Sequence, residues 1–129
     1  MSTRLNVSSG SPFEPVFGYS RAVRVGDRIV VGGTAPIWPD GSCDPDPGVQ
    51  AARCLEIGLD GIVRAGGRPE DVVRTRMFIT DPAIAEAVGL AHARVFAEIR
   101  PAATMVVVAG LLDERWKVEI ELEATLGAG

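Results

Sequence analysis

The residues from Val118 to Glu123 alternate strictly between branched aliphatic side chains and glutamates. Because successive side chains of a β-strand point to opposite faces, this alternation predicts a strand with one apolar and one acidic face. The apolar side of such a strand must be covered, whereas its acidic side faces solvent or a partner molecule. The pattern therefore predicts a sheet with one covered face and one open face.

Further segments have the composition of strands. Ala22–Val25 and Ile29–Val31 are rich in β-branched residues and flank a Gly-Asp pair, which predicts a hairpin. Val72–Ile79 predicts a third strand, which ends before a proline-containing turn. Met105–Ala109 is apolar on both faces and predicts a central strand buried on both sides.

Two segments have the periodicity of helices. Between Val49 and Ala65 the apolar residues form a helical stripe, and the Gly-Gly pair that follows suits a helix C-terminus. Asp81 can cap a second helix with a proline at its first position, and we expect this helix to continue to Arg100-Pro101. The residues before Tyr19 are rich in serine, glycine and proline and predict an irregular N-terminal arm.

The order of these elements is β-β-α-β-α-β-β. It predicts an α/β (α+β) fold in which two helices pack on one face of a single mixed sheet. The 129 residues suffice for one domain, which we expect to span residues 1–129. Aromatic residues make up only 5% of the chain, so the core must consist mainly of aliphatic side chains. Oligomerisation is the natural way to cover the open face of the sheet.

The composition argues against several classes of partner. A net charge of -4 and a pI near 5.0 disfavour nucleic acid, which usually binds to a clustered basic face. No apolar run approaches the ~18 residues needed to cross a membrane, so we expect a cytoplasmic protein with no membrane partner. Cys43 and Cys54 have the spacing of neither a CxxC redox pair nor a zinc knuckle, and we expect reduced thiols and no metal.

Several short stretches, in this order and spacing, resemble the Rid/YjgF family (RidA-like enamine/imine deaminases) from about Tyr19 to about Ala124. The stretches are Tyr19-Ser20-Arg21-Ala22-Val23, Ile29-Val30-Val31-Gly32-Gly33-Thr34-Ala35-Pro36, Ala65-Gly66-Gly67, Asp71-Val72-Val73, Phe78-Ile79-Thr80-Asp81, Arg100-Pro101-Ala102 and Val118-Glu119-Ile120-Glu121.

The resemblance implies a chorismate-mutase-like fold and a homotrimer with three ligand clefts at the subunit boundaries. Archetypal members hydrolyse a small enamine or imine, derived from an amino acid, to a 2-oxo acid and ammonia. The family needs no metal and no organic cofactor for this reaction. The implied partner is therefore a small-molecule ligand.

The chain departs from the archetypal pattern at Ala103, where those members have the arginine that binds the substrate carboxylate. Loss of a bidentate arginine removes an interaction of about 1.5–3 kcal/mol. Arg76, in the third predicted strand, is a candidate replacement, although an ion pair with a glutamate is the more ordinary role for it. Thr104 follows Ala103 and is a candidate to line a more apolar pocket.

Four other residues are candidates for the site. By the resemblance, Glu119 aligns with the carboxylate that orients the attacking water, Tyr19 with a tyrosine of the cleft, and Gly33 with a glycine beside the ligand. The alternatives are a solvent-facing glutamate, a tyrosine that caps the core and a glycine that ends a strand. His92 is the only histidine, and it suits either proton transfer or packing on a helix.

The resulting hypothesis is a Rid-like hydrolase or deaminase that acts on a small nitrogenous metabolite, with Glu119 as the catalytic residue. The alternative is a non-catalytic trimer that binds a small metabolite or a partner enzyme. A ribonuclease activity, sometimes attributed to this family, is disfavoured by the acidic pI and the few aromatic residues.

Overall fold

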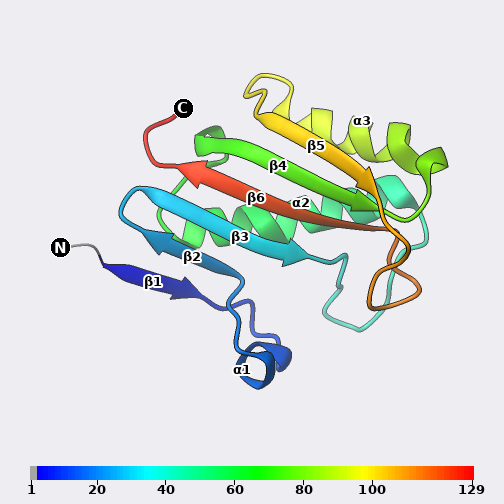
Figure 1. Ribbon diagram of the computed structural model, residues 1–129, viewed down its shortest axis with the longest axis horizontal. Helices are drawn as coiled ribbons and strands as arrows, with labels where there is room; N and C mark the ends of the chain where they lie inside the picture. The colour runs from blue at the N-terminus through cyan, green and yellow to red at the C-terminus, as the bar shows by residue number, and fades with distance from the viewer. Residues whose placement is uncertain (1–2) are drawn as a thin grey trace.

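The computed structural model describes residues 3–129 and contains one six-stranded sheet with the order β1-β2-β3-β6-β4-β5 (Figure 1). The strands are β1 (Arg4–Val7), β2 (Ala22–Val25), β3 (Arg28–Thr34), β4 (Val72–Ile79), β5 (Ala102–Val107) and β6 (Val118–Thr125). The helices are α1 (Phe13–Phe17), α2 (Pro47–Arg64) and α3 (Ala85–Phe96), with short 3-10 turns η1 (Pro69–Asp71) and η2 (Pro82–Ile84). Met1 and Ser2, included in the predicted domain, lie outside the described residues.

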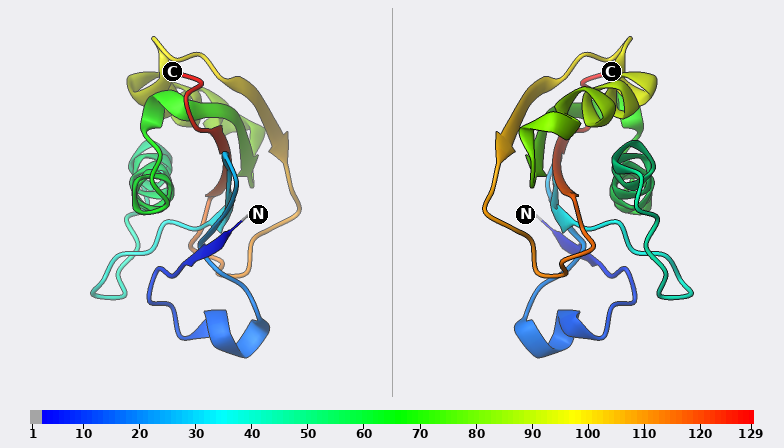
Figure 2. Two further views of the ribbon diagram at one scale, coloured as in Figure 1. Left: turned by 90° about the vertical axis from the view of Figure 1, so that its left-hand side faces the viewer. Right: turned by 90° about the vertical axis from the view of Figure 1, so that its right-hand side faces the viewer.

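The sheet is mixed, because β4 and β5 are parallel and every other neighbouring pair is antiparallel. Seen along the sheet, α2 and α3 lie on the same side of it (Figure 2). The predicted fold class, with two helices on one face of a single mixed sheet, is confirmed. The last strand of the chain, β6, lies in the interior of the sheet between β3 and β4.

The core lies between the sheet and these two helices. As expected from the few aromatic residues, aliphatic side chains dominate it. Among its fully buried members are Ile29, Val31, Leu55, Ile62, Ile79, Val88, Phe96, Val118, Ile120 and Leu122. The alternation in β6 is the alternation predicted: its aliphatic residues are buried and its glutamates are only partly covered.

The helices begin at the predicted caps. The Asp46 side chain accepts a hydrogen bond from the Val49 amide at the start of α2, and Gly66, just after its end, has a φ of 100°. Asp81 caps the turn η2 instead of α3 itself. The second helix also ends at Phe96, before the predicted Arg100, which has a positive φ of 54°. A residue that precedes proline is disfavoured in the helical region, so the chain leaves the helix earlier.

Two expectations were wrong. The apolar run predicted as a central strand forms the edge strand β5, with Val106 and Val107 41% and 53% exposed. Apolarity on both faces indicates surfaces to be covered but does not fix a strand's place in the sheet. The N-terminal arm is also more regular than expected, because β1 pairs with β2 and the short helix α1 follows. Pro15 lies within the first turn of α1, where a proline is tolerated.

Within residues 3–129, every helix is too short or too polar to cross a bilayer.

Candidate functional site

The open face of the sheet is formed in its middle by β4 and β6. In this antiparallel pair Arg74 lies opposite Glu123, Arg76 opposite Glu121, and Phe78 opposite Glu119. All of these side chains project away from the helices, because the residues between them are the buried ones. The face therefore has a ladder of charged pairs that ends at Glu119, where an aromatic ring replaces the cation.

Two of the three glutamates are neutralised. Glu123 is within 3.4 Å of Arg74 Nε and 3.5 Å of Arg28 Nη2, and Glu121 Oε1 is 3.3 Å from Arg76 Nη1. Glu119 forms no ion pair with any residue from 3 to 129. Glu119 thus differs from the two glutamates that share its strand and face.

The environment of Glu119 favours its protonated form. Burial raises the pKa of its carboxyl, the charge of Arg21 opposes this shift, and the negative charge of Glu121 adds to it. A half-buried carboxylate without a cationic partner can accept a proton from water and return it to a leaving group. This environment is suited to general acid–base chemistry.

Gly33 lies directly against Glu119. A Cβ atom added at Gly33 would be 2.8 Å from Glu119 Oε2, which is closer than real Cβ contacts. The pairing of β3 with β6 is irregular between Val31 and Thr34, and this bulge brings the Gly33 backbone towards the carboxylate. The structure therefore brings together two of the site residues expected from the sequence.

Arg76 and Thr104 lie on the same face of the sheet as Glu119. Arg76 pairs with Thr104 across β4 and β5, one alternate position along β4 from Phe78, which faces Glu119. Its guanidinium group is engaged with Glu121, so the ion pair suggested by the sequence is present. Tyr19 lies just after α1, is 43% exposed, and donates its amide hydrogen to Glu14 O.

Ala103 and His92 are not brought to Glu119. Ala103 lies opposite Thr75, whose side chain points to the helix-covered face. His92 on α3 also lies on that face: its Nε2 is 2.9 Å from Thr75 Oγ1, and its ring packs on Phe96. Burial lowers the pKa of His92. Within one chain, His92 and Glu119 therefore lie on opposite faces of the sheet.

Arg21 is a residue of this region that sequence reasoning did not single out. It is only 8% exposed, and its Nη1 donates to Gly33 O at 2.6 Å, to Thr34 Oγ1 at 3.0 Å and to Gly32 O at 3.3 Å. Arg21 thus holds the irregular end of β3, and it is the cation that lowers the Glu119 pKa. Its place within the stretch Tyr19–Val23 was the available signal.

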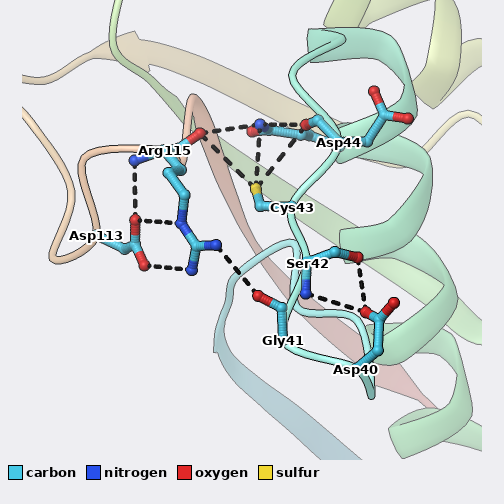
Figure 3. A network of polar contacts seen from close by, with 8 residues as sticks. Asp40, Gly41, Ser42, Cys43, Asp44, Asp113 and Arg115 are labelled. Atoms are coloured by element: carbon cyan, nitrogen blue, oxygen red, sulfur yellow. Dashed lines mark hydrogen bonds and ion pairs between the residues drawn. The ribbon is translucent and has the colours of Figure 1, made fainter.

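A polar network fixes the chain just before Glu119 (Figure 3). Arg115 binds Asp113 at 2.8 Å, which lowers the pKa of Asp113 to about 2, and donates to Gly41 O at 3.1 Å. The buried Gln50 of α2 donates to Arg115 O at 3.0 Å and accepts the amide hydrogen of Lys117 at 2.8 Å. The start of β6 is therefore tied to the start of α2 and to the loop before it.

The site contains no obvious metal ligands. Among residues 3–129, no three His, Cys, Asp or Glu side chains are grouped so that they could hold a metal ion. Cys43 and Cys54 are both free, and burial raises the pKa of the Cys54 thiol. The chemistry available at Glu119 is that of a carboxylate, water and backbone groups.

Comparison with known proteins agrees with this architecture. The family model described as endoribonuclease L-PSP matches residues 10–126. The chain belongs to this family, also called the YjgF family. An uncharacterized protein of Streptomyces coelicolor is 39% identical over 123 residues, which cover 95% of this chain and 92% of that protein.

Two solved structures of YjgF-type folds illustrate the likeness. Rv2704 of Mycobacterium tuberculosis, a member of the YjgF/YER057c/UK114 family, is 40% identical with a TM-score of 0.89, covering 96% of this chain and 100% of its own. TdcF of E. coli, solved with bound serine, is 27% identical with a TM-score of 0.79, covering 93% of this chain and 92% of its own.

Proposed function

We propose that this YjgF-family chain is a deaminase-type hydrolase that acts on the C–N bond of a small enamine or imine. The observation behind the proposal is the state of Glu119, which is half-buried, has a raised pKa, has no ion-pair partner within residues 3–129 and lies against Gly33. Its two neighbours on the same face, Glu121 and Glu123, are neutralised by arginines.

The chemistry requires one water molecule and one group that moves protons. Glu119 accepts a proton as water adds to the imine carbon, which gives a carbinolamine. Glu119 then returns the proton to the nitrogen, the C–N bond breaks, and ammonia leaves as the carbonyl forms. The overall change is imine plus water to carbonyl compound plus ammonia, and neither an oxidant nor a metal is needed.

A small ligand derived from an amino acid fits this proposal. TdcF of E. coli was solved with bound serine, which is a ligand of this size and type. In this chain the carboxylate of such a ligand cannot bind a side chain at Ala103. Arg76 is the arginine of the open face nearest in register to Glu119, and it would have to exchange Glu121 for the ligand.

We further propose that the cleft is completed in a homotrimer, by residues of a second copy of the chain. The open face and the β5 edge are available for such contacts, since Val106 and Val107 are exposed there and β5 has no neighbour on its outer side. Tyr19 and Thr104 are the candidates to line the cleft from these exposed segments.

The test is a coupled assay of 2-aminoacrylate hydrolysis with wild-type protein, Glu119→Gln and Glu121→Gln. We expect wild-type turnover, a loss of roughly 10²–10⁴-fold in Glu119→Gln, and turnover within a few-fold of wild type in Glu121→Gln. Glu121→Gln is the matched control because Glu121 shares the strand and face of Glu119 but is already paired with an arginine. Equal loss in both variants would contradict the proposal.

A second candidate function follows from Ala103. With a methyl group at the position of the archetypal arginine, the scaffold is suited to binding a small metabolite without turnover. An Ala103→Arg variant distinguishes the two functions. Silence in wild type and turnover gained in Ala103→Arg would indicate a binding protein that kept the fold, whereas Glu119-dependent turnover in wild type supports the hydrolase.

A further inference from the structure

A hollow of about 410 Å³ lies away from the Glu119 site, between the N-terminal arm, the loop that follows β3, and α2. These segments lie at the same end of the molecule (Figure 2). Its charged lining residues are Arg21 and Arg53, and no carboxylate lines it. This volume is within the usual range for small-molecule sites, roughly 300–1,000 Å³.

Arg21 has the features of an arginine that is held ready for a ligand. Its Nη1 is fixed by three acceptors on β3, whereas its buried Nε has no hydrogen-bond partner among residues 3–129. The nearby Glu14 accepts hydrogen bonds from the amide and hydroxyl of Ser9 and forms no ion pair with Arg21. A buried, unsatisfied guanidinium donor is costly, and an anion would satisfy it.

Arg53 supplies a second cation that is already oriented. Its Nε donates to Ile37 O at 2.7 Å, and its Nη1 pairs with Glu56, which lies on the outer side of α2 and is largely exposed. The adjoining smaller hollow differs, because Glu56, Asp60 and Arg64 line it and balance its charge. The larger hollow is therefore the one with an excess of positive charge.

The remainder of the wall is apolar. Trp38, Ile37 and Ile57 line the hollow opposite or beside the two arginines. We propose that this hollow binds a small organic carboxylate, with the carboxylate on Arg21 and Arg53 and an apolar body against Trp38 and Ile57. Planar or short aliphatic acids have the required shape, because bidentate arginine contacts suit a carboxylate and an indole suits an apolar body.

This site is separate from the one around Glu119. Gly33 lies between them: its carbonyl oxygen accepts from Arg21, whereas its Cα faces the Glu119 carboxylate. Neither hollow described here is lined by Glu119, Arg76 or Thr104. The inference therefore does not depend on the proposed hydrolase, and it stands or falls by ligand binding alone.

The experiment uses the indole of Trp38 as a reporter. The chain has two tryptophans, so a Trp116→Phe background leaves Trp38 as the only one. Benzoate is titrated against Trp38 fluorescence, with uncharged benzamide and inorganic phosphate as comparison ligands. We expect saturable binding of benzoate, binding of benzamide and phosphate weaker by about tenfold or more, and a similar loss for benzoate in Arg53→Gln.

Two variants separate this site from the others. Arg53 lies on the helix surface and is 21% exposed in its side chain, so Arg53→Gln is expected to fold even if Arg21→Gln does not. Glu119→Gln should bind benzoate as the background does. The proposal is overturned if benzoate does not bind, if benzamide or phosphate binds equally well or better, if Arg53→Gln binds unchanged, or if Glu119→Gln abolishes binding.

Discussion

The two faces of β6 differ in what they contribute, although they alternate residue by residue along one strand. On the face covered by α2 and α3, Val118, Ile120 and Leu122 are at most 1% exposed. On the open face, Glu119, Glu121 and Glu123 are partly exposed, and only Glu119 lacks an ion pair within residues 3–129. The comparison teaches that stability and chemistry are separable here by the side of the strand on which a substitution falls.

The largest effect is expected on the covered face. Ile120→Ala removes a buried side chain and leaves a cavity, which should cost about 2–5 kcal/mol of unfolding free energy. The measurement is urea denaturation followed by circular dichroism. Glu121→Ala, one residue along on the open face, should cost no more than about 1 kcal/mol. Similar losses for the two variants would break the separation of the faces.

A methyl group at Gly33 tests the open face. Because the added Cβ would be 2.8 Å from Glu119 Oε2, Gly33→Ala should displace the carboxylate and lower turnover by about tenfold or more, equivalent to about 1.4 kcal/mol. Stability should fall much less than in Ile120→Ala, since a flexible carboxylate end can move. Gly110→Ala is the control, as its added Cβ meets nothing within 4 Å. Full turnover in Gly33→Ala would show that the position of Glu119 against Gly33 is unimportant.

A smaller effect is expected from the ion pairs of the open face. Arg76→Gln removes a partly exposed pair with Glu121 and should change stability by no more than about 1 kcal/mol, less at high salt. If Arg76 holds the ligand carboxylate, KM should rise in Arg76→Gln and not in Arg74→Gln, which removes a comparable pair with Glu123. Steady-state kinetics of both variants measure this, and an equal change in KM would exclude a specific role for Arg76.

The smallest effect is the pH dependence of stability contributed by Glu119. Because its pKa is raised in the folded state, the folded protein holds this proton more tightly than the unfolded chain. Wild type should therefore lose stability relative to Glu119→Gln as the pH rises from the ordinary glutamate pKa of about 4.3 through the raised value. Thermal melts at a series of pH values measure the difference, which should vanish below this window. A variant that is less stable than wild type at neutral pH would contradict the sign.

Much of the fold was predictable because it depends on local patterns. The alternation from Val118 to Glu123 fixed which side of β6 is buried, and Asp46 and Gly66 mark the limits of α2. The position of β5 was not predictable in this way. Its apolar sequence suits either a central or an edge strand, and the choice depends on which neighbours reach it in three dimensions.

The site was predictable only in part. Glu119 and Gly33 were singled out through the family resemblance, and the structure places them in contact. The difference between Glu119 and Glu121 was not predictable, because it depends on the register that sets Phe78 or Arg76 opposite each of them. Arg21 was missed for a related reason. Burial of an arginine depends on acceptors such as Gly33 O that the chain brings to it only on folding.

The central position of β6 has a consequence for biosynthesis. β6 is the last strand to leave the ribosome, yet it joins β3 on one side to β4 on the other (Figure 1). Until it is added, the hairpin of β2 and β3 and the parallel pair of β4 and β5 have no hydrogen bonds to each other, and Gly33 has no carboxylate beside it. Pairing between such distant segments is slow to form. A nascent chain therefore acquires its completed sheet and its candidate acid–base residue in the same late step.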